Sequence, residues 1–405
     1  MNRRILLCLY FFPPLGGPRS LRWLNLVKVL SERGWTIDVL TVKPSLHDSF
    51  YDAGLLKELP PGIRVYRSFP GFYYSLLHSR KRRALGFPKT TLEWLPFGIL
   101  KGAQLAGSRK YDILISSALP FVGHLVGYFL KRRMRIPWVV DYGDPLSFNP
   151  TPSSIKRLVG RWFERRILRR ADGLIAAAEG MREDFLAHFP FLRGISTRAI
   201  PSGIPGEIDH VQAADFGDRF VITYAGSFYK GTREPYQFFR ALQALIRDGE
   251  VRSRLSVLIA GSVEPAYLEA ARKLHIQDSV QFLGRISFQE VMSILKGSSV
   301  ILYIGSHWSH RHFQYKIFEY AASGRPIIAI RQADTDLSAA FIEEKNLGRV
   351  VSNDPENIAR AVAELFDLWK TRSLDRSFAP LDKDMYTWGR RGKEVEDFIN
   401  PFVRH

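Results

Sequence analysis

Lys316 and Glu319 are the two residues whose charges and spacing are best suited to ligand binding or catalysis. They stand three positions apart, so both side chains project from one face near the start of a predicted helix over 313–322. Gly324 predicts the end of that helix, and Pro326 leads into a buried strand over 327–330. Charged side chains at a helix start beside a parallel sheet suit nucleotide binding. The alternative is a solvated ion pair worth about 0.2–0.5 kcal/mol.

A second candidate site follows the first predicted strand. Gly16 and Gly17 end the segment 10–17, which joins that strand to a helix. Adjacent glycines let the backbone approach a ligand closely, and the helix start offers free N–H groups to an anion. The alternative for this segment is a plain strand-to-helix turn.

The elements around these sites alternate between apolar runs and amphipathic stretches, which favours α/β domains with parallel sheets. The predicted strands are 5–10, 37–42, 113–116, 138–141, 173–177, 220–224, 255–260, 280–282, 300–303 and 327–330. The predicted helices are 21–33, 91–106, 121–133, 155–170, 235–247, 266–274, 288–295, 313–322 and 356–369, with a tail helix within 386–403. The segment 201–206 is rich in proline and glycine and predicts a hinge.

The composition agrees with two folded domains. The chain has 405 residues, of which 46% are hydrophobic and 24% charged, and these values exclude general disorder. Cys8 is the only cysteine, so no intramolecular disulfide forms and a reducing compartment is suitable. The apolar start of the chain lacks a small-residue cleavage site, and Pro120 divides the uncharged run 113–130. We therefore predict neither a signal peptide nor a transmembrane span.

The net charge of +18 belongs entirely to the first half of the chain. Residues 1–200 contain 32 Lys/Arg and 14 Asp/Glu, whereas residues 201–405 contain 26 of each. The basic residues cluster at 80–83, 131–135 and 165–170. This asymmetry predicts an anionic membrane surface as partner, and no motif favours nucleic acid. A basic, solubilising surface is the alternative. Because the sequence offers no inserted anchor, we expect high salt to release the protein from membranes.

Three blocks of the chain resemble the family 4 (group 1) retaining glycosyltransferases, which have the GT-B fold. The first is the segment 10–17, an aromatic residue followed by Pro-Pro and Gly-Gly. The second, 112–144, contains Ser-Ser, then Ile-Pro-Trp-Val, then Asp141 and Asp144. The third contains Glu319 and the turn from Gly324 to Pro326. The resemblance implies two facing Rossmann-like domains, 1–205 for the acceptor and 206–383 for the nucleotide sugar, with helix 384–405 packing on the first.

The resemblance also implies roles for the loop 225–235. Lys230 and Arg233 would hold the donor diphosphate, and Gly226 would let the loop bend around it. Two fixed cations would stabilise the charge that grows on the leaving nucleoside diphosphate. A surface loop with ordinary charges is the alternative.

Four further residues receive roles from the resemblance. Glu319 would accept hydrogen bonds from the two ribose hydroxyls, and Lys316 would reach phosphate or pair with Glu319. Arg285 follows a glycine in the loop that would frame the nucleobase. Asp144 is the candidate for a contact with an acceptor or donor hydroxyl, or else it caps the next turn.

Two positions depart from the family pattern. Family enzymes often have histidine or arginine immediately before the second aspartate of the second block, and here that position is Gly143. The first glutamate of the donor motif should lie eight residues before Glu319, and here that position is Arg311. These replacements indicate a different sugar or a weakened site. The three histidines around Arg311 lack a neighbouring acid, so we predict no metal site there.

These observations predict a retaining, metal-independent glycosyltransferase with no cofactor. It would move a sugar from a UDP- or GDP-sugar to a glycan or lipid-linked acceptor in cell-surface polysaccharide biosynthesis. We expect it in the cytoplasm, peripheral on the inner face of the plasma membrane. The alternatives are a GT-B-fold UDP-sugar epimerase and a catalytically silent subunit that binds a nucleotide sugar or scaffolds a partner.

Overall fold

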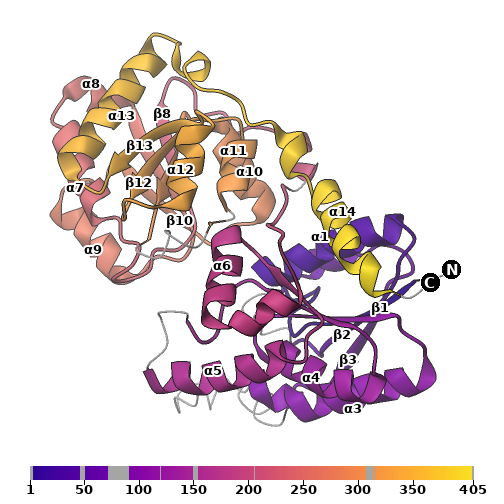
Figure 1. Ribbon diagram of the computed structural model, residues 1–405. Helices are drawn as coiled ribbons and strands as arrows, with labels where there is room; N and C mark the ends of the chain where they lie inside the picture. The colour runs from indigo at the N-terminus through magenta and orange to yellow at the C-terminus, as the bar shows by residue number, and fades with distance from the viewer. Residues whose placement is uncertain are drawn as a thin grey trace. The chain divides into compact units, whose positions relative to one another are not determined.

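The computed structural model describes residues 3–45, 51–71, 91–118, 120–148, 154–204, 206–306, 313–314 and 316–403. The chain forms two compact units, an N-terminal unit of residues 1–203 and 388–405 and a C-terminal unit of residues 204–387 (Figure 1). The first division falls at residue 203 rather than the predicted 205, and the second at residue 387 rather than 383. Ile204 and Thr387 explain these positions, because they pair with each other in an isolated parallel bridge.

The N-terminal unit is built on a seven-stranded parallel sheet with the order β3-β2-β1-β4-β5-β6-β7. Its strands are β1 (Arg4–Cys8), β2 (Thr36–Val42), β3 (Arg64–Ser68), β4 (Ile113–Ser117), β5 (Trp138–Tyr142), β6 (Gly173–Ala176) and β7 (Ser196–Ala199). Its helices are α1 (Pro18–Glu32), α3 (Trp94–Ser108), α4 (Val122–Met134), α5 (Ser154–Leu168), α6 (Glu179–His188) and α14 (Trp388–Ile399). The central strands β1, β4 and β5 are almost fully buried, because helices cover both faces of the sheet.

The C-terminal unit has a six-stranded parallel sheet with the order β10-β9-β8-β11-β12-β13. Its strands are β8 (Phe220–Ala225), β9 (Leu255–Ala260), β10 (Val280–Gly284), β11 (Val300–Ile304), β12 (Ile327–Arg331) and β13 (Gly348–Ser352). Its helices are α7 (Tyr236–Leu245), α8 (Gly249–Arg254), α9 (Pro265–Lys273), α10 (Phe288–Gly297), α11 (Lys316–Ala322), α12 (Leu337–Glu344) and α13 (Pro355–Lys370). Side chains of α7, α9 and α13 share one core, and those of α10, α11 and α12 share another.

The C-terminal helix α14 returns to the N-terminal unit, as predicted. It lies beside α1 on one face of the sheet, while α3 and α4 pack together on the other face (Figure 1). Glu396 of α14 forms an ion pair with Arg33 and a second one with Arg3, at 3.1 Å. The Glu396 carboxylate also accepts a hydrogen bond of 3.0 Å from Trp35 Nε1. These contacts hold the end of the chain on the domain where it began.

The predicted α/β architecture is confirmed, and the strands that the sequence did not predict are edge strands. β3 and β7 border the first sheet, and β13 borders the second. Their residues are only partly buried, because an edge strand has one open side. Among the described residues, no helix is both long and apolar enough to cross a bilayer.

Candidate functional site

In each sheet the chain builds strands first to one side of its first strand and then to the other, so the strand order reverses beside that strand. Parallel α/β proteins bind ligands at such a point. In the N-terminal unit this point lies between β1 and β4, and in the C-terminal unit between β8 and β11. Gly16 and Gly17 follow β1, and Gly226 follows β8. The sequence-predicted glycine loops therefore lie at the carboxyl ends where ligands bind.

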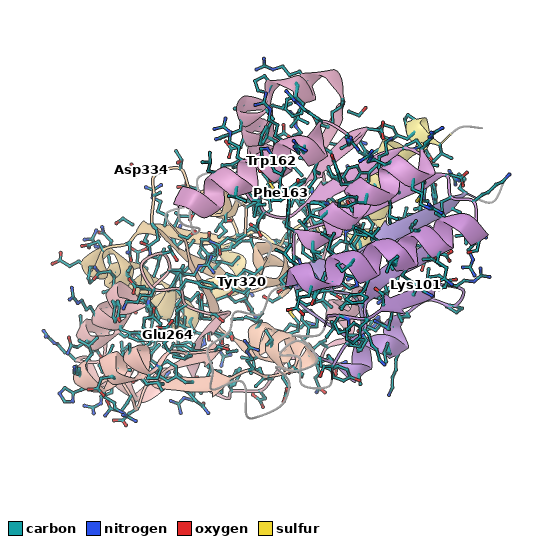
Figure 2. All side chains as sticks on the ribbon, turned by 90° about the horizontal axis from the view of Figure 1, so that it is seen from below. Lys101, Trp162, Phe163, Glu264, Tyr320 and Asp334 are labelled. Atoms are coloured by element: carbon teal, nitrogen blue, oxygen red, sulfur yellow. The ribbon has the colours of Figure 1, made fainter. Side chains whose placement is uncertain are left out.

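Lys316 is the central residue of the C-terminal unit's site. It begins α11, and its Nζ is buried without a hydrogen-bond partner among the described residues. Three tyrosine rings surround this nitrogen, with centroids at 4.4 Å for Tyr224, 5.5 Å for Tyr320 (labelled in Figure 2) and 6.0 Å for Tyr303. Burial lowers the pKa of Lys316 well below its usual value, and the charge of Arg233 lowers it further. A bound anion would supply the missing partner.

Arg233 is the second cation of this site. Its loop is held tightly, because Tyr229 and Arg233 exchange two backbone hydrogen bonds of 2.8 Å. The Arg233 Nε is buried and has no hydrogen-bond partner in the described parts of the chain. The half-buried Arg233 lies close enough to lower the pKa of Lys316, so two positive groups share this site, which favours a ligand with more than one negative charge.

Gly226 allows this close arrangement. Its φ of 138° is a backbone conformation that other residues rarely adopt. A Cβ at this position would lie 3.3 Å from Lys316 Nζ, and a Cβ on Gly261 would overlap the carbonyl oxygen of Gly226. Side chains at these two positions would therefore displace the loop from the sheet.

Glu319 lies one turn along α11 from Lys316. Burial raises the pKa of its carboxyl to about 7, although the charge of Lys316 acts in the opposite direction. The structure thus brings together Lys316, Glu319, Arg233 and Gly226, four of the residues that the sequence singled out. Lys230 is exposed on the same loop, outside this buried group. Arg285 is also exposed, and its Nε donates a hydrogen bond of 2.7 Å to Ser262 Oγ after β9.

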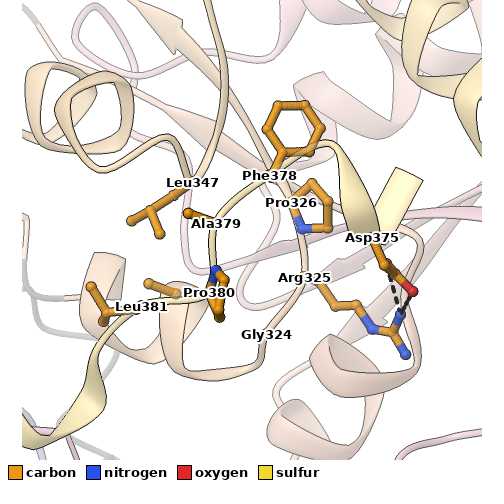
Figure 3. Close-up of a pocket in the computed structure, with 10 residues that line it drawn as sticks. Gly324, Arg325, Pro326, Leu347, Asp375, Phe378, Ala379, Pro380 and Leu381 are labelled. Atoms are coloured by element: carbon orange, nitrogen blue, oxygen red, sulfur yellow. Dashed lines mark hydrogen bonds and ion pairs between the residues drawn. The ribbon is translucent and has the colours of Figure 1, made fainter. Parts of the chain in front are cut away.

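Gly324 and Pro326 of the same sequence block lie at the other edge of the sheet. They precede β12 and line a pocket with Arg325, Asp375 and Phe378 (Figure 3). Arg325 closes one side of that pocket through its ion pair with Asp375, at 3.3 Å. Gly324 has a φ of 76° just after α11, so its contribution is to end the helix.

The N-terminal unit's site contains charged groups that form ion pairs with each other, although Arg22 Nε and Nη1 have no hydrogen-bond partner among the described residues. Asp141, on β5, is fully buried and accepts hydrogen bonds from Arg22 at 3.1 Å, Trp23 at 2.9 Å and Ser117 at 2.8 Å. Burial alone would raise the pKa of Asp141, but Arg19, Arg22 and the hydrogen bonds hold it at about 2. The carboxylate therefore stays charged and fixes the start of α1 to the sheet.

Arg19 is the site residue that the sequence did not reveal. A Cβ added to Gly143 would overlap the guanidinium of Arg19, so this side chain from α1 occupies the place of a residue-143 side chain. Arg19 Nε donates a hydrogen bond of 2.6 Å to the Ala118 carbonyl, and its Nη2 lies 3.5 Å from Asp141. The sequence contains one sign of this contact, which is Gly143 at a position where family members often carry histidine or arginine.

Asp144 lies beside Arg19 at the carboxyl end of β5. Burial raises the pKa of Asp144, and the charge of Arg19 lowers it in part. Gly17 has a φ of 97° and caps α1, and Gly16 is buried next to it. The predicted N-terminal residues Gly16, Gly17 and Asp144 therefore share one edge of the sheet.

The surroundings of His124 indicate a role in the fold rather than in ligand binding. It is fully buried, and its Nδ1 lies 2.8 Å from Ser116 Oγ. Burial lowers its pKa to about 3, so the ring is neutral. No group of three potential metal ligands occurs among the residues that the structure describes. Arg311 and the histidines beside it lie outside those residues.

Comparisons with known proteins agree with this geometry. Residues 20–203 match the model of the glycosyl transferase 4-like domain, and residues 219–367 match that of glycosyl transferases group 1. None of the curated protein sequences matches the chain.

Several solved structures are similar over nearly the whole chain. Sucrose-phosphate synthase from Thermosynechococcus elongatus is 18% identical with a TM-score of 0.70, covering 99% of each chain. Alr3699/HepE from Anabaena, in complex with UDP and glucose, is 13% identical with a TM-score of 0.65, covering 99% of this chain and all of that one. A UDP-N-acetylglucosamine 2-epimerase is 14% identical with a TM-score of 0.62, covering 99% of this chain and 97% of that one.

At these identities the structural likeness shows the fold, and the family matches show the lineage. The two matched segments, 20–203 and 219–367, together span most of the 405 residues. The resemblance inferred from the sequence is confirmed: the chain belongs to the group 1 glycosyltransferases, enzymes of the GT-B fold.

Proposed function

We propose that this glycosyltransferase moves a sugar, with retention of configuration, from a UDP- or GDP-sugar to a glycan or lipid-linked acceptor. The observation that carries this proposal is the buried, unpartnered Lys316 Nζ with Arg233 in its neighbourhood, at the carboxyl ends of β8 and β11 in the described part of the chain. A diphosphate brings two or more negative charges and suits two neighbouring positive side chains. The structure of Alr3699/HepE with UDP and glucose supports a uridine nucleotide as the first candidate.

Each residue of the C-terminal site then has a role. Lys316 and Arg233 bind the diphosphate and stabilise the charge that develops on it when the bond to the sugar breaks. Glu319 accepts hydrogen bonds from the ribose hydroxyls, and it does so most strongly when its carboxyl is ionised. Arg285 lies in the loop beside the nucleobase, and the exposed Lys230 contributes through longer-range charge. The reaction needs no metal and no cofactor in this scheme, because the side-chain cations neutralise the leaving group.

The N-terminal unit provides the acceptor contacts. Asp144 accepts a hydrogen bond from a sugar hydroxyl, and Arg19 supplies the positive group that Gly143 lacks. The proton of the attacking hydroxyl passes to an oxygen of the donor diphosphate, so no strongly basic side chain is required. The chain's product belongs to cell-surface polysaccharide biosynthesis, and the basic N-terminal half holds the enzyme on the inner face of the plasma membrane.

Incubation with candidate nucleotide sugars tests the proposal. The donors are first screened for thermal stabilisation of the protein, and the stabilising donor is then supplied without acceptor. A transferase hydrolyses it slowly to nucleoside diphosphate and a sugar, and nuclear magnetic resonance shows the configuration first released. Retention supports the proposal, whereas inversion contradicts it. An epimerase, favoured by its similar fold, would instead yield the C2 epimer. A silent subunit would bind the donor and leave it intact.

A further inference from the structure

Helix α5 exposes an apolar stripe on its outer side. Leu158 is 72% exposed, Val159 and Trp162 are each 51% exposed, and Phe163 is 36% exposed. These four positions recur at intervals of one and four residues, so they lie along one side of the helix. The opposite side, with Gly160 and Glu164, faces the protein. Four neighbouring large apolar side chains in water mark a binding surface rather than a solvated helix.

The same outer side carries positive charge and no negative charge. Arg161, Arg165 and Arg166 are exposed among the apolar side chains, and the guanidinium of Arg166 lies 4.0 Å from the Trp162 ring centroid. Glu164 is the only acidic residue in 154–170, and it is fully buried. The last turn of the neighbouring helix α4 adds Arg132 and Arg133, whereas Lys131 in that turn forms an ion pair with Asp172.

This combination selects one kind of partner. Aromatic and aliphatic side chains between arginines fit the boundary between lipid headgroups and acyl chains, where rings insert and guanidinium groups meet phosphates. A purely apolar partner would leave several arginines without counter-charges. A nucleic acid would not account for Leu158 and Val159, which offer neither charge nor a ring for stacking.

We propose that α5 lies in the plane of an anionic membrane and inserts Leu158, Val159, Trp162 and Phe163 at the headgroup boundary. Figure 2 shows Trp162 and Phe163 on this helix in a view from below. The inference rests on the membrane-surface part of the proposed function and adds an inserted element to it. It replaces the sequence-based expectation of release by salt, because insertion adds binding free energy that salt does not screen.

The helix is joined to the N-terminal site. The Glu164 carboxylate accepts backbone hydrogen bonds from Leu146 at 2.9 Å and Ser147 at 3.0 Å, and it also accepts one from the Ser147 hydroxyl. A Cβ on Gly160 would lie 2.9 Å from Leu146 Cγ, so the helix and this loop are in close contact. The loop directly follows Asp144. A membrane-bound α5 would therefore hold the acceptor-binding residues at the surface where a lipid-linked acceptor lies.

Flotation with vesicles tests the proposal. The full chain is mixed with vesicles of phosphatidylcholine, with or without phosphatidylglycerol, at low and high salt. We expect binding that requires phosphatidylglycerol and that persists in part at high salt. The double variant W162S/F163S should reduce high-salt partitioning by about tenfold or more, from the apolar area withdrawn. The control Leu100→Ser removes an exposed leucine from α3, 68% exposed, and should bind like the wild type.

A second readout locates the inserted residue. Brominated lipids should quench part of the wild-type tryptophan fluorescence, and Trp162→Phe should abolish most of that quenching while it retains binding. Three results would each overturn the proposal. They are wild-type partitioning of the W162S/F163S variant, complete release of the wild-type protein from vesicles by high salt, and quenching by brominated lipids that is unchanged in Trp162→Phe. Donor hydrolysis in the absence of vesicles separates this result from the glycosyltransferase proposal, because W162S/F163S should hydrolyse the donor at the wild-type rate.

Discussion

The two units share a strand order around their candidate sites, but they differ in whether the charged side chains there form ion pairs. In the N-terminal unit the buried Asp141 is matched by Arg22, Arg19 and two hydrogen-bonding side chains. In the C-terminal unit no carboxylate forms an ion pair with Lys316 or Arg233 among the described residues, and Lys316 Nζ is buried without an acceptor. Ion-paired groups stabilise the fold of their unit. A buried cation without an ion-pair partner has an unfavourable desolvation free energy, which a bound anionic ligand would offset. The comparison supports the proposed roles, with anion binding in the C-terminal unit and acceptor hydroxyl contacts in the N-terminal one.

Removal of Asp141 should produce the largest effect on stability. Asp141→Ala leaves Arg22, only 1% exposed, as an uncompensated buried charge, and we expect a loss of about 3–5 kcal/mol in the free energy of unfolding. Urea denaturation measures this loss. Asp218→Ala, at an exposed ion pair of 3.5 Å with Arg254, is the matched control and should change stability by less than about 1 kcal/mol. Equal losses for the two variants would remove the contrast between the units.

Arg233→Ala should lower turnover by about 100-fold. The affinity for a nucleoside monophosphate should fall much less, because charge develops on the diphosphate mainly in the transition state. Steady-state kinetics and calorimetry provide the two quantities. Lys230→Ala, on the exposed part of the same loop, should have a smaller effect on turnover. If turnover and monophosphate affinity decline equally, Arg233 has no special role in the transition state.

Glu319→Ala should weaken nucleotide binding by about 1.5–3 kcal/mol while the fold survives, because a charge-assisted hydrogen bond to ribose is lost. The pH dependence sharpens this prediction. The pKa of Glu319 is raised to about 7, so its carboxylate gains a proton as the pH falls through 7 and accepts hydrogen bonds poorly below it. Wild-type affinity for a nucleotide sugar should decrease below pH 7, and Glu319→Gln should remove that decrease. If the Glu319→Gln variant keeps the wild-type dependence of affinity on pH, another group is responsible for that dependence.

The sequence predicted those parts of the fold that are buried on both faces. Apolar runs such as 113–115 and 327–330 became central strands. β3, β7 and β13 escaped prediction because each has only four or five residues, most of them polar or small, and forms no apolar run. The helices α6, α8 and α12 were missed as well, and each has ten residues or fewer. α6 and α12 separate apolar from polar residues less clearly than the similarly short α7, α9 and α10, and α8 has only six residues.

The site was predictable where its residues are close in sequence. Lys316 and Glu319 share one helix, so their spacing was informative. The contact between Arg19 and Gly143 joins α1 to the end of β5, and a single sequence contains no sign of such a pairing beyond the unusual glycine. The burial that shifts the pKa of Glu319 also arises from packing between elements. Spacing within one element therefore identified the residues, and only tertiary structure revealed their charge states.

The most direct test of the contrast between the units is a paired measurement on Lys316→Met. Methionine fills a similar volume without the charge, so the free energy of unfolding should stay the same or rise. Calorimetric titration with UDP and GDP should show binding to the wild type and a loss of about 2 kcal/mol or more for the preferred nucleotide in the variant. A more stable protein with weaker diphosphate binding is the predicted result. Unchanged nucleotide affinity, or a large loss of stability, would show that Lys316 is a structural residue and would contradict the proposed donor site.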